Sequence, residues 1–241
     1  CSSDLYGFGF LIASVNDIFI NSLTSALSPQ IYKNMKLDDE HSNKKIQQLI
    51  TIYVSLAIVM NIGITVFGSL GIYYFINKNY QSVALFFPLL SLSYLPRIFF
   101  TAYQIPVFFY EKTKILPFIN LFTLILYTIG FIILAPILGI YGVCIAAIII
   151  KLSQMFSLYV YIRRIKLDKK NGSLFQLKEQ YLVSILIFAY VGLWYLFTQN
   201  INENIKFIYL FPLFFITFPY VVYKIIMVMN FRIGDILNFK K

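Results

Sequence analysis

The chain has 241 residues, of which 59% are hydrophobic and only 12% are charged, and its formal net charge is +10. A soluble domain of this length needs far more charged surface to stay in solution, so the composition excludes an ordinary soluble protein. The basic residues lie mainly between apolar blocks, which indicates membrane topology rather than nucleic-acid binding.

The apolar residues occur in long blocks. A block of roughly 18 or more such residues crosses the hydrocarbon core as a helix, because lipid offers no partners for unpaired backbone groups. The strands of a membrane barrel would instead alternate apolar and polar residues. We therefore expect an all-α, polytopic membrane helix bundle. Its seven predicted transmembrane helices cover residues 6–27, 47–72, 82–105, 115–137, 139–162, 181–199 and 207–229.

The segments outside these spans differ in length and charge. The opening residues, CSSDL, resemble the translated end of a sequencing adapter, so we expect residues 1–5 to be a non-native leader. The linkers 28–46 and 163–180 are polar and charged, and the second is the most basic stretch of the chain. Between the fourth and fifth spans, the stretch from Pro136 to Gly142 predicts a tight turn between two antiparallel helices.

The basic side chains are divided unequally between alternate loops. One set of loops, together with the C-terminal end, holds sixteen Lys and Arg residues, whereas the other holds only Lys78 and Lys206. The positive-inside rule places the first set, and with it the C-terminus, in the cytoplasm. Seven spans then put residue 6 outside, so we expect an earlier span in a longer parent protein.

Three ionisable residues fall inside predicted spans, namely Asp17, Arg97 and Lys151. Each costs roughly 2.5–3.5 kcal/mol on insertion, so each is expected to face protein or a water-filled cavity. All three lie 12 to 14 residues from the predicted cytoplasmic ends of their spans, and therefore at similar depth. Polar or small residues recur around them at helical spacing: Ser14, Asn21, Thr24 and Ser28; Ser93, Tyr94, Thr101 and Gln104; Cys144, Ala147 and Gln154.

These three helix faces have two interpretations. The first is a hydrated substrate cavity of net charge about +1, with the candidate lining residues Arg97, Lys151, Asp17, Asn21, Tyr94, Thr101, Gln104 and Gln154. The second is that Asp17 and Arg97 only pair and hold two helices together. Lys151 would then still need a partner, which favours the cavity. The only histidine, His41, lies in a charged linker, and no motif predicts a catalytic, metal or cofactor site, so we do not expect an enzyme.

Three sequence motifs follow one another between residues 22 and 164. Residues 22–33 (SLTSALSPQIYK) place a proline before a charged linker, and residues 110–114 (YEKTK) precede a helix that contains Asn120. Residues 136–147 (PILGIYGVCIAA) form a glycine-bounded hairpin that leads to YIRR at 161–164. This order resembles the polysaccharide-export flippases of the multidrug/oligosaccharidyl-lipid/polysaccharide (MOP) exporter superfamily, the O-antigen-type, MATE-like transporters of lipid-linked oligosaccharides.

The resemblance covers residues 6–164 and implies most of the second lobe of a two-lobed transporter with a cationic central cavity. Residues 165–241 would add a cytoplasmic linker and two further transmembrane helices. The implied activity is alternating-access transport of an undecaprenyl-pyrophosphate-linked oligosaccharide across the bacterial inner membrane. The implied partners are this lipid-linked glycan, membrane lipids and glycan-assembly proteins, without nucleic acid. The resemblance implies no cofactor beyond a coupling ion, Na⁺ or H⁺.

On this reading Arg97 and Lys151 would attract the pyrophosphate, Asp17 would balance or gate them, and Tyr94 and Tyr103 would stack on sugar rings. A multidrug or other cation-coupled exporter of the same superfamily is an alternative, but its site should be rich in carboxylates. A membrane glycan polymerase or ligase would need a long external loop, and the external loops predicted here are short. A purely structural subunit would leave the three buried charges unexplained.

Overall fold

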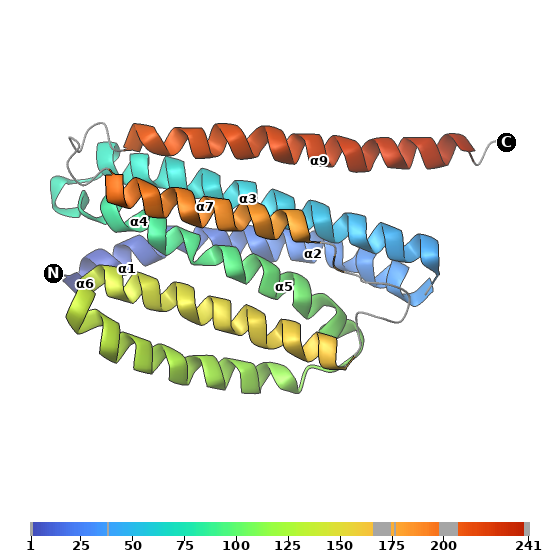
Figure 1. Cartoon of the computed structure of the whole chain (residues 1–241), viewed down its shortest axis with the longest axis horizontal. Coiled ribbons are helices and arrows are strands. Elements are labelled where there is room, and N and C mark those ends of the chain that lie inside the picture. Colours follow the sequence, from blue (N-terminus) through green and yellow to red (C-terminus); the bar gives the residue numbers. More distant parts are fainter. Residues whose placement is uncertain (1, 38, 166–174, 176, 198–206, 239–241) are drawn as a thin grey trace.

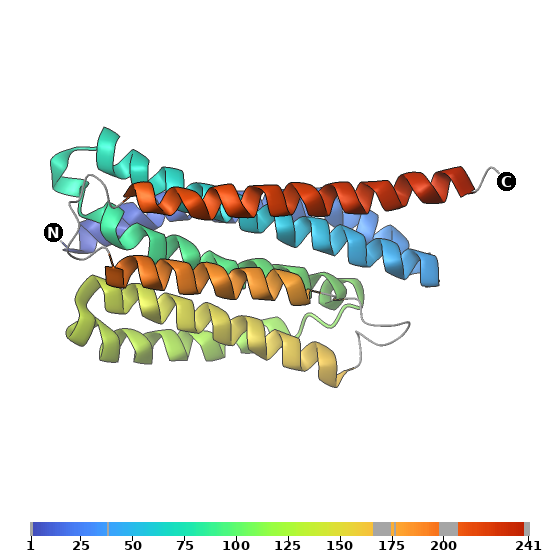
Figure 2. The ribbon, with the colours of Figure 1, turned by 45° about the horizontal axis from the view of Figure 1, so that its top comes forward.

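The structure, a computed structural model, describes residues 2–37, 39–165, 175, 177–197 and 207–238. These residues form an elongated bundle whose helices run roughly along one common axis, as two views of the ribbon show (Figures 1 and 2). The described residues contain helices and turns but no strand. The elements are α1 (Ser2–Ala13), α2 (Val15–Leu37), α3 (Glu40–Phe75), η1 (Lys78–Tyr80), α4 (Val83–Leu92), α5 (Tyr94–Phe109), α6 (Ile115–Arg164), α7 (Lys178–Phe197), η2 (Phe207–Leu210) and α9 (Phe211–Asn238).

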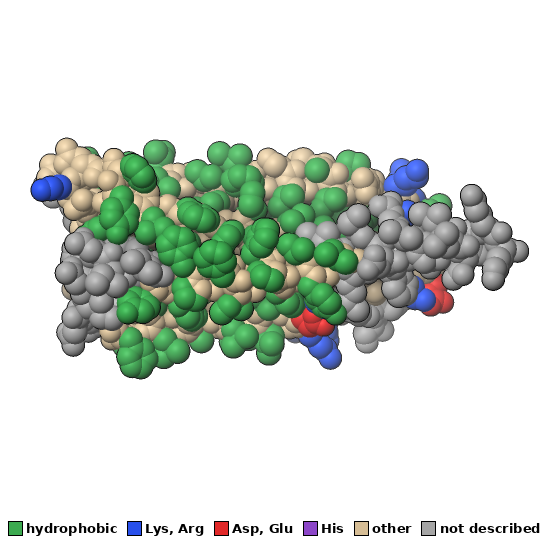
Figure 3. All heavy atoms as spheres, turned by 90° about the horizontal axis from the view of Figure 1, so that it is seen from above, with side chains coloured by type: hydrophobic (Ala, Val, Ile, Leu, Met, Phe, Trp, Pro, Cys, Tyr) green, Lys and Arg blue, Asp and Glu red, His purple; other side chains and the backbone are tan. Residues whose placement is uncertain are grey.

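The helices have the length and composition of a membrane protein. Five stretches are long and apolar enough to cross a bilayer: Asp4–Leu37, Glu40–Phe75, Val83–Phe109, Ile115–Arg164 and Lys178–Phe197. Large hydrophobic side chains cover much of the face seen in Figure 3, and charged side chains gather toward its two ends. The prediction of a helical membrane bundle is confirmed at this level. The count of seven spans stays a prediction, because five stretches have the required length and the last apolar stretch, 211–224, is shorter.

Helix α6 is a hairpin rather than a single rod. Its backbone leaves the helical region at Gly139, where φ is 58° and ψ is −136°, and the chain reverses there (Figure 1). A side-chain hydrogen bond of 2.8 Å from Gln154 to Asn120 joins the two antiparallel arms. Glycine is required at position 142, because a Cβ atom there would lie 2.1 Å from the carbonyl oxygen of Leu134. The predicted turn between two antiparallel helices is therefore present.

Two of the long apolar stretches are interrupted at one serine each. Ser14 separates α1 from α2, and Ser93 separates α4 from α5. Each hydroxyl bonds to a carbonyl one turn back, Ser14 to Leu11 at 2.6 Å and Ser93 to Leu90 at 2.7 Å. Pro96 contributes to the second interruption, because it lacks an N–H group and its ring obstructs a continuous helix. The interruption at Ser93 lies within the third predicted span, 82–105.

The linker predicted at 28–46 is mostly helical, which corrects the sequence-based prediction. Helix α2 continues through Pro29 to Leu37, and α3 begins at Glu40 after the N-cap Asp39. Polar composition shows that a segment leaves the lipid, not that its helix ends. Here the helices continue because apolar residues on both of them remain buried, namely Ile31, Met35, Ile46 and Ile50. Hydrogen bonds from Ser42 stabilise the ionised N-cap and hold the pKa of Asp39 below its usual range.

The helix ends fall at two opposite ends of the bundle. The junction of α5 with α6 and the end of α6 lie toward one end of the bundle, and the junction of α2 with α3 extends further in the same direction (Figure 1). The element η1 and the reversal of α6 lie toward the other end. This alternation agrees with the division of charge. The segments 28–46 and 106–114 belong to the set of loops that holds sixteen basic residues, whereas 73–81 holds Lys78 of the other set. The predicted external loop 200–206 and most of the linker 163–180 lie outside the described residues. Which end faces the cytoplasm stays a prediction.

Candidate functional site

The three ionisable residues predicted inside the membrane come from three different helices. Asp17 is on α2, Arg97 is on α5, and Lys151 is on the second arm of α6. Each lies well inside one of the stretches that are apolar enough to cross a bilayer. Lys151 also lies within electrostatic range of both Asp17 and Arg97. The structure therefore brings the three charges into one cluster.

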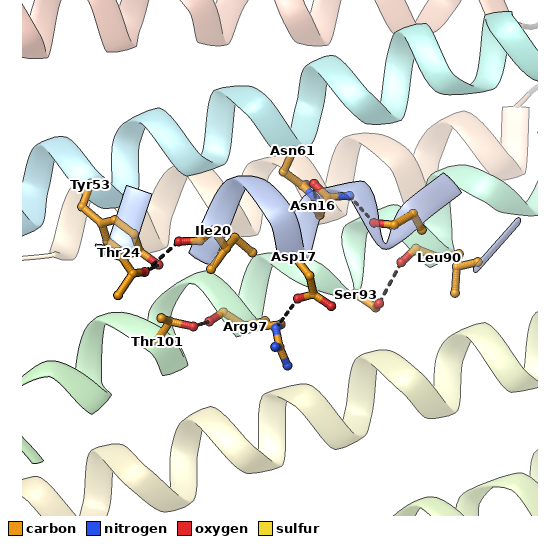
Figure 4. Close-up of polar contacts among 11 residues, drawn as sticks. Asn16, Asp17, Ile20, Thr24, Tyr53, Asn61, Leu90, Ser93, Arg97 and Thr101 are labelled. Atoms are coloured by element: carbon orange, nitrogen blue, oxygen red, sulfur yellow. Dashed lines mark hydrogen bonds and ion pairs between the residues drawn. The ribbon is translucent and has the colours of Figure 1, made fainter. Parts of the chain in front are cut away.

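Asp17 and Arg97 form an ion pair between α2 and α5. The Arg97 Nε atom lies 2.5 Å from Oδ1 of Asp17, and the close-up in Figure 4 shows the two side chains pointing toward each other. The remaining parts of the two side chains are about one-third exposed, with relative accessibilities of 34% for Arg97 and 31% for Asp17. The pair is thus formed at a partly open position.

Lys151 is held by an aromatic ring. Its ammonium nitrogen lies 3.4 Å from the centroid of the Tyr94 ring, within the range of a cation–π interaction. Tyr94 is only 1% exposed, so the ring is fixed by its surroundings. With Asp17 already paired to Arg97, the cluster of two cations and one carboxylate carries a net charge of +1.

A buried polar network lies next to the ion pair. The Asn61 amide on α3 donates to Oδ1 of Asn16 at 3.0 Å and to the carbonyl oxygen of Ser91 at 2.9 Å. Asn16 in turn donates to the Ser91 hydroxyl at 3.3 Å and to the carbonyl of Ala13 at 2.9 Å. Thr65 reaches the same Ser91 hydroxyl at 2.9 Å. The network joins α2, α3 and α4 beside both helix interruptions (Figure 4).

The sequence identified this network only in part. Asn16 and Asn61 can be recognised in the sequence as amides inside the predicted spans 6–27 and 47–72, whereas Ser91 and Thr65 were missed. Thr65 follows Asn61 by one helical turn, and its hydroxyl also bonds to the Asn61 carbonyl at 2.8 Å. That spacing was the available signal. It was weak, because serine and threonine commonly bond to their own helix in membrane proteins.

Several predicted lining residues do not join the charge cluster. Asn21 is exposed on α2, and Gln154 bonds to Asn120 across the α6 hairpin. The Thr101 hydroxyl bonds to the carbonyl of Arg97 on its own helix at 2.9 Å, and Gln104 is half-buried one turn further on. Their predicted role in lining a cavity stays a prediction.

The two tyrosines expected to stack on sugar rings, Tyr94 and Tyr103, are both covered by other side chains, and their role in stacking stays a prediction. Tyr94 lies beneath Lys151, and Tyr103 is 1% exposed and contacts the Tyr181 hydroxyl. Tyr103 also lies against Phe175, with ring centroids 4.7 Å apart. A ring that is buried on both faces cannot stack on a sugar without rearrangement.

Two grooves have apolar walls that include none of the three charged residues. The larger, about 520 Å³, runs between α1, α2, α3 and α9 and is lined by residues such as Val59, Phe67 and Phe214. The smaller, about 250 Å³, lies between α5, α6 and α7 and is lined by residues such as Phe99, Leu152 and Phe188. The hydrated cavity predicted around Asp17, Arg97 and Lys151 stays a prediction.

Comparisons with protein-family models, with curated proteins and with solved structures found no match for this chain.

Proposed function

We propose that this chain is part of a flippase that moves an anionic, lipid-linked oligosaccharide across a membrane by alternating access. The observation that carries the proposal is the cation of Lys151. It lies at the middle of an apolar hairpin arm and within reach of Arg97, while the nearby carboxylate of Asp17 is already paired. The order of sequence motifs that resembles polysaccharide-export flippases supports the same reading.

The electrostatics favour an anionic cargo. Two unit charges 4 Å apart interact by about 4 kcal/mol at an effective dielectric constant of about 20, against about 1 kcal/mol in bulk water. A pyrophosphate that enters beside the cluster would therefore meet an attraction several times stronger than in bulk water. Lys151 can turn toward such a group, because a cation–π contact contributes only about 0.5–2 kcal/mol.

In this proposal the two cations have different roles. Arg97 is neutralised by Asp17, so its first role in this proposal is to hold α2 against α5. Its guanidinium group, on a side chain that is 34% exposed, can add hydrogen bonds to a phosphate that Lys151 has already attracted. This ordering refines the sequence-based expectation, in which Arg97 and Lys151 were equivalent.

The alternative of a cation exporter is less well supported. A site for a cationic drug or a coupling cation needs a carboxylate that is free to bind it. The cluster offers one carboxylate, and Arg97 occupies one of its oxygens at 2.5 Å. A net positive cluster would repel a cationic cargo.

The proposal is tested by binding and transport with the chain reconstituted in proteoliposomes. The cargo is a short polyprenyl pyrophosphate that carries one fluorescent sugar, and the corresponding neutral polyprenol glycoside is the control lipid. We expect preferential binding of the pyrophosphate, a loss of at least tenfold in Lys151→Gln, and substantial retention in Lys151→Arg, which keeps the charge. Sugar that becomes accessible on the opposite leaflet reports transport.

The result that would overturn the proposal is equal binding of the charged and neutral lipids, with Lys151→Gln unchanged at normal protein levels. Preferential binding of a cationic dye such as ethidium that is lost in Asp17→Asn would support the cation exporter instead.

A further inference from the structure

The two ends of helix α6 leave the bundle together. Its arms are antiparallel, and the bond between Asn120 and Gln154 fixes their register. Residues 112–114, just before α6, and residues 163–164, at its end, therefore lie at the same level along the bundle. Figure 1 shows the α5–α6 junction and the end of α6 close to the same level along the long axis.

This end of the hairpin is strongly cationic. Four exposed basic side chains, which we call the hairpin-end patch, are Lys112, Lys114, Arg163 and Arg164. Glu111 is the only acidic residue in the whole stretch from 106 to 165. Four positive charges and one negative charge give this end a net charge of +3.

Two local contacts orient the patch. Glu111 adopts a left-handed backbone conformation with φ of 56°, and the Lys112 amide bonds back to the carbonyl of Val107 at 2.9 Å. This closes α5 and turns the chain outward at Lys112. On the other arm the Arg163 guanidinium lies 5.0 Å from the centroid of the Tyr159 ring. Tyrosines near helix ends are typical of the level at which a helix passes from hydrocarbon to headgroups.

We infer that the hairpin-end patch binds the headgroups of anionic phospholipids in the surrounding bilayer. Arginine guanidinium groups match phosphate oxygens in geometry, and lysines supply additional charge. Basic residues beside the membrane surface attract anionic lipids, and the patch lies directly beside an apolar hairpin that acyl chains can cover. This inference is independent of the proposed transport function, because it concerns a different set of residues.

A second basic group at the same end of the bundle is charge-compensated and serves as an internal control. It lies around the junction of α2 with α3 and contains Lys33, Lys36, Lys44 and Lys45. Asp39 and Glu40 stand within it, and Lys44 pairs with Glu40 at 3.0 Å. We expect weaker lipid selectivity here although the number of basic residues is the same.

The test uses the full chain in neutral detergent and a phosphatidylglycerol with a fluorescent acyl chain, whose anisotropy reports binding. Unlabelled phosphatidylglycerol, phosphatidylcholine and inorganic phosphate are the competitors. We expect phosphatidylglycerol to compete well, phosphatidylcholine poorly, and inorganic phosphate only weakly, because a lipid adds contacts along the hairpin. Apparent affinity should fall about fivefold for each lysine removed in Lys112→Gln/Lys114→Gln.

Two further variants keep the inference testable if the double substitution disturbs folding. Glu111→Gln removes the one acidic residue beside the patch and should raise the affinity severalfold. Lys33→Gln/Lys36→Gln removes the same number of charges from the compensated group and should change the affinity less than twofold. Equal losses at both groups would show a general charge effect and overturn the inference, as would equal competition by phosphatidylcholine. Strong competition by inorganic phosphate would assign the patch to soluble anions instead.

Discussion

Arg97 and Asp17 meet across two helices, with the Arg97 Nε atom 2.5 Å from Asp17 Oδ1, although they lie on separate apolar stretches of the chain. Both stretches are interrupted close to this contact, at Ser14 before Asp17 and at Ser93 before Arg97. The ion pair thus joins the longer segment that follows each interruption, α2 to α5.

The first prediction concerns this pair. Asp17→Asn or Arg97→Gln alone should destabilise the chain by about 1–3 kcal/mol, because each leaves one charge without its partner at a partly shielded position. The double variant should recover most of the loss. Thermal unfolding in detergent measures the effect, and the double-mutant cycle isolates the coupling. Strictly additive losses would show that the two side chains do not stabilise each other.

The second prediction concerns the polar network. Asn61→Leu keeps a similar side-chain volume but removes both bonds that the amide donates, so it should destabilise the bundle by about 1–2 kcal/mol. Asn120→Leu is the matched control, because Asn120 is exposed and accepts one bond from Gln154. The destabilisation by Asn120→Leu should be well under half of that by Asn61→Leu. The same melting assay compares them, and equal losses would argue against a special role for the network.

The third prediction concerns the turn of the α6 hairpin. Gly142→Ala should severely reduce folded protein, because the added Cβ would lie 2.1 Å from a main-chain oxygen that cannot move independently. Gly130→Ala should be tolerated, since its Cβ would lie 3.5 Å from that of Ala146, an ordinary contact distance. The yield of monodisperse protein after detergent extraction distinguishes the two. Normal yield of Gly142→Ala would mean that the arms separate easily.

The fourth prediction concerns topology. In a background in which Cys1 and Cys144 are replaced, Asn79→Cys should react with a membrane-impermeant maleimide added to intact cells. Lys114→Cys should react only after the membrane is permeabilised. The physical reason is the excess of basic residues at the end of the bundle that contains Lys114. Labelling of both positions from outside would refute the predicted orientation.

The sequence predicted the helices of this fold well because the apolar blocks are long and sharply bounded. The hairpin at Gly139 followed from its glycines and proline, and the two arms of α6 agree with the predicted spans 115–137 and 139–162 within a few residues. The prediction of a loop at 28–46 was wrong, because α2 and α3 continue through its charged residues while apolar residues on both helices remain buried. Local composition cannot report that burial, because it depends on which helix lies alongside.

The sequence predicted which residues form the charge cluster, but not which side chains contact one another. Helical spacing and depth singled out Asp17, Arg97 and Lys151, and three buried charges have few ways to be satisfied. The sequence left open whether Asp17 pairs with one cation or lies between two. The position of Lys151 over Tyr94 could not be foreseen, because it depends on how the α6 hairpin packs against α5.

The α6 hairpin also has a consequence for how the protein enters the membrane. Its first arm, from Ile115 to Gly139, contains no ionisable side chain apart from Tyr127, so it can enter the bilayer without an electrostatic penalty. The second arm carries Lys151, whose insertion alone would cost roughly 2.5–3.5 kcal/mol. Because the arms are antiparallel and closely joined, they can insert together. The favourable insertion of the apolar first arm then offsets the cost of inserting Lys151. Translation proceeds from the N-terminus, so Asp17, Tyr94 and Arg97 are made before Lys151. The last charge of the cluster can therefore enter a membrane in which its aromatic partner is already present.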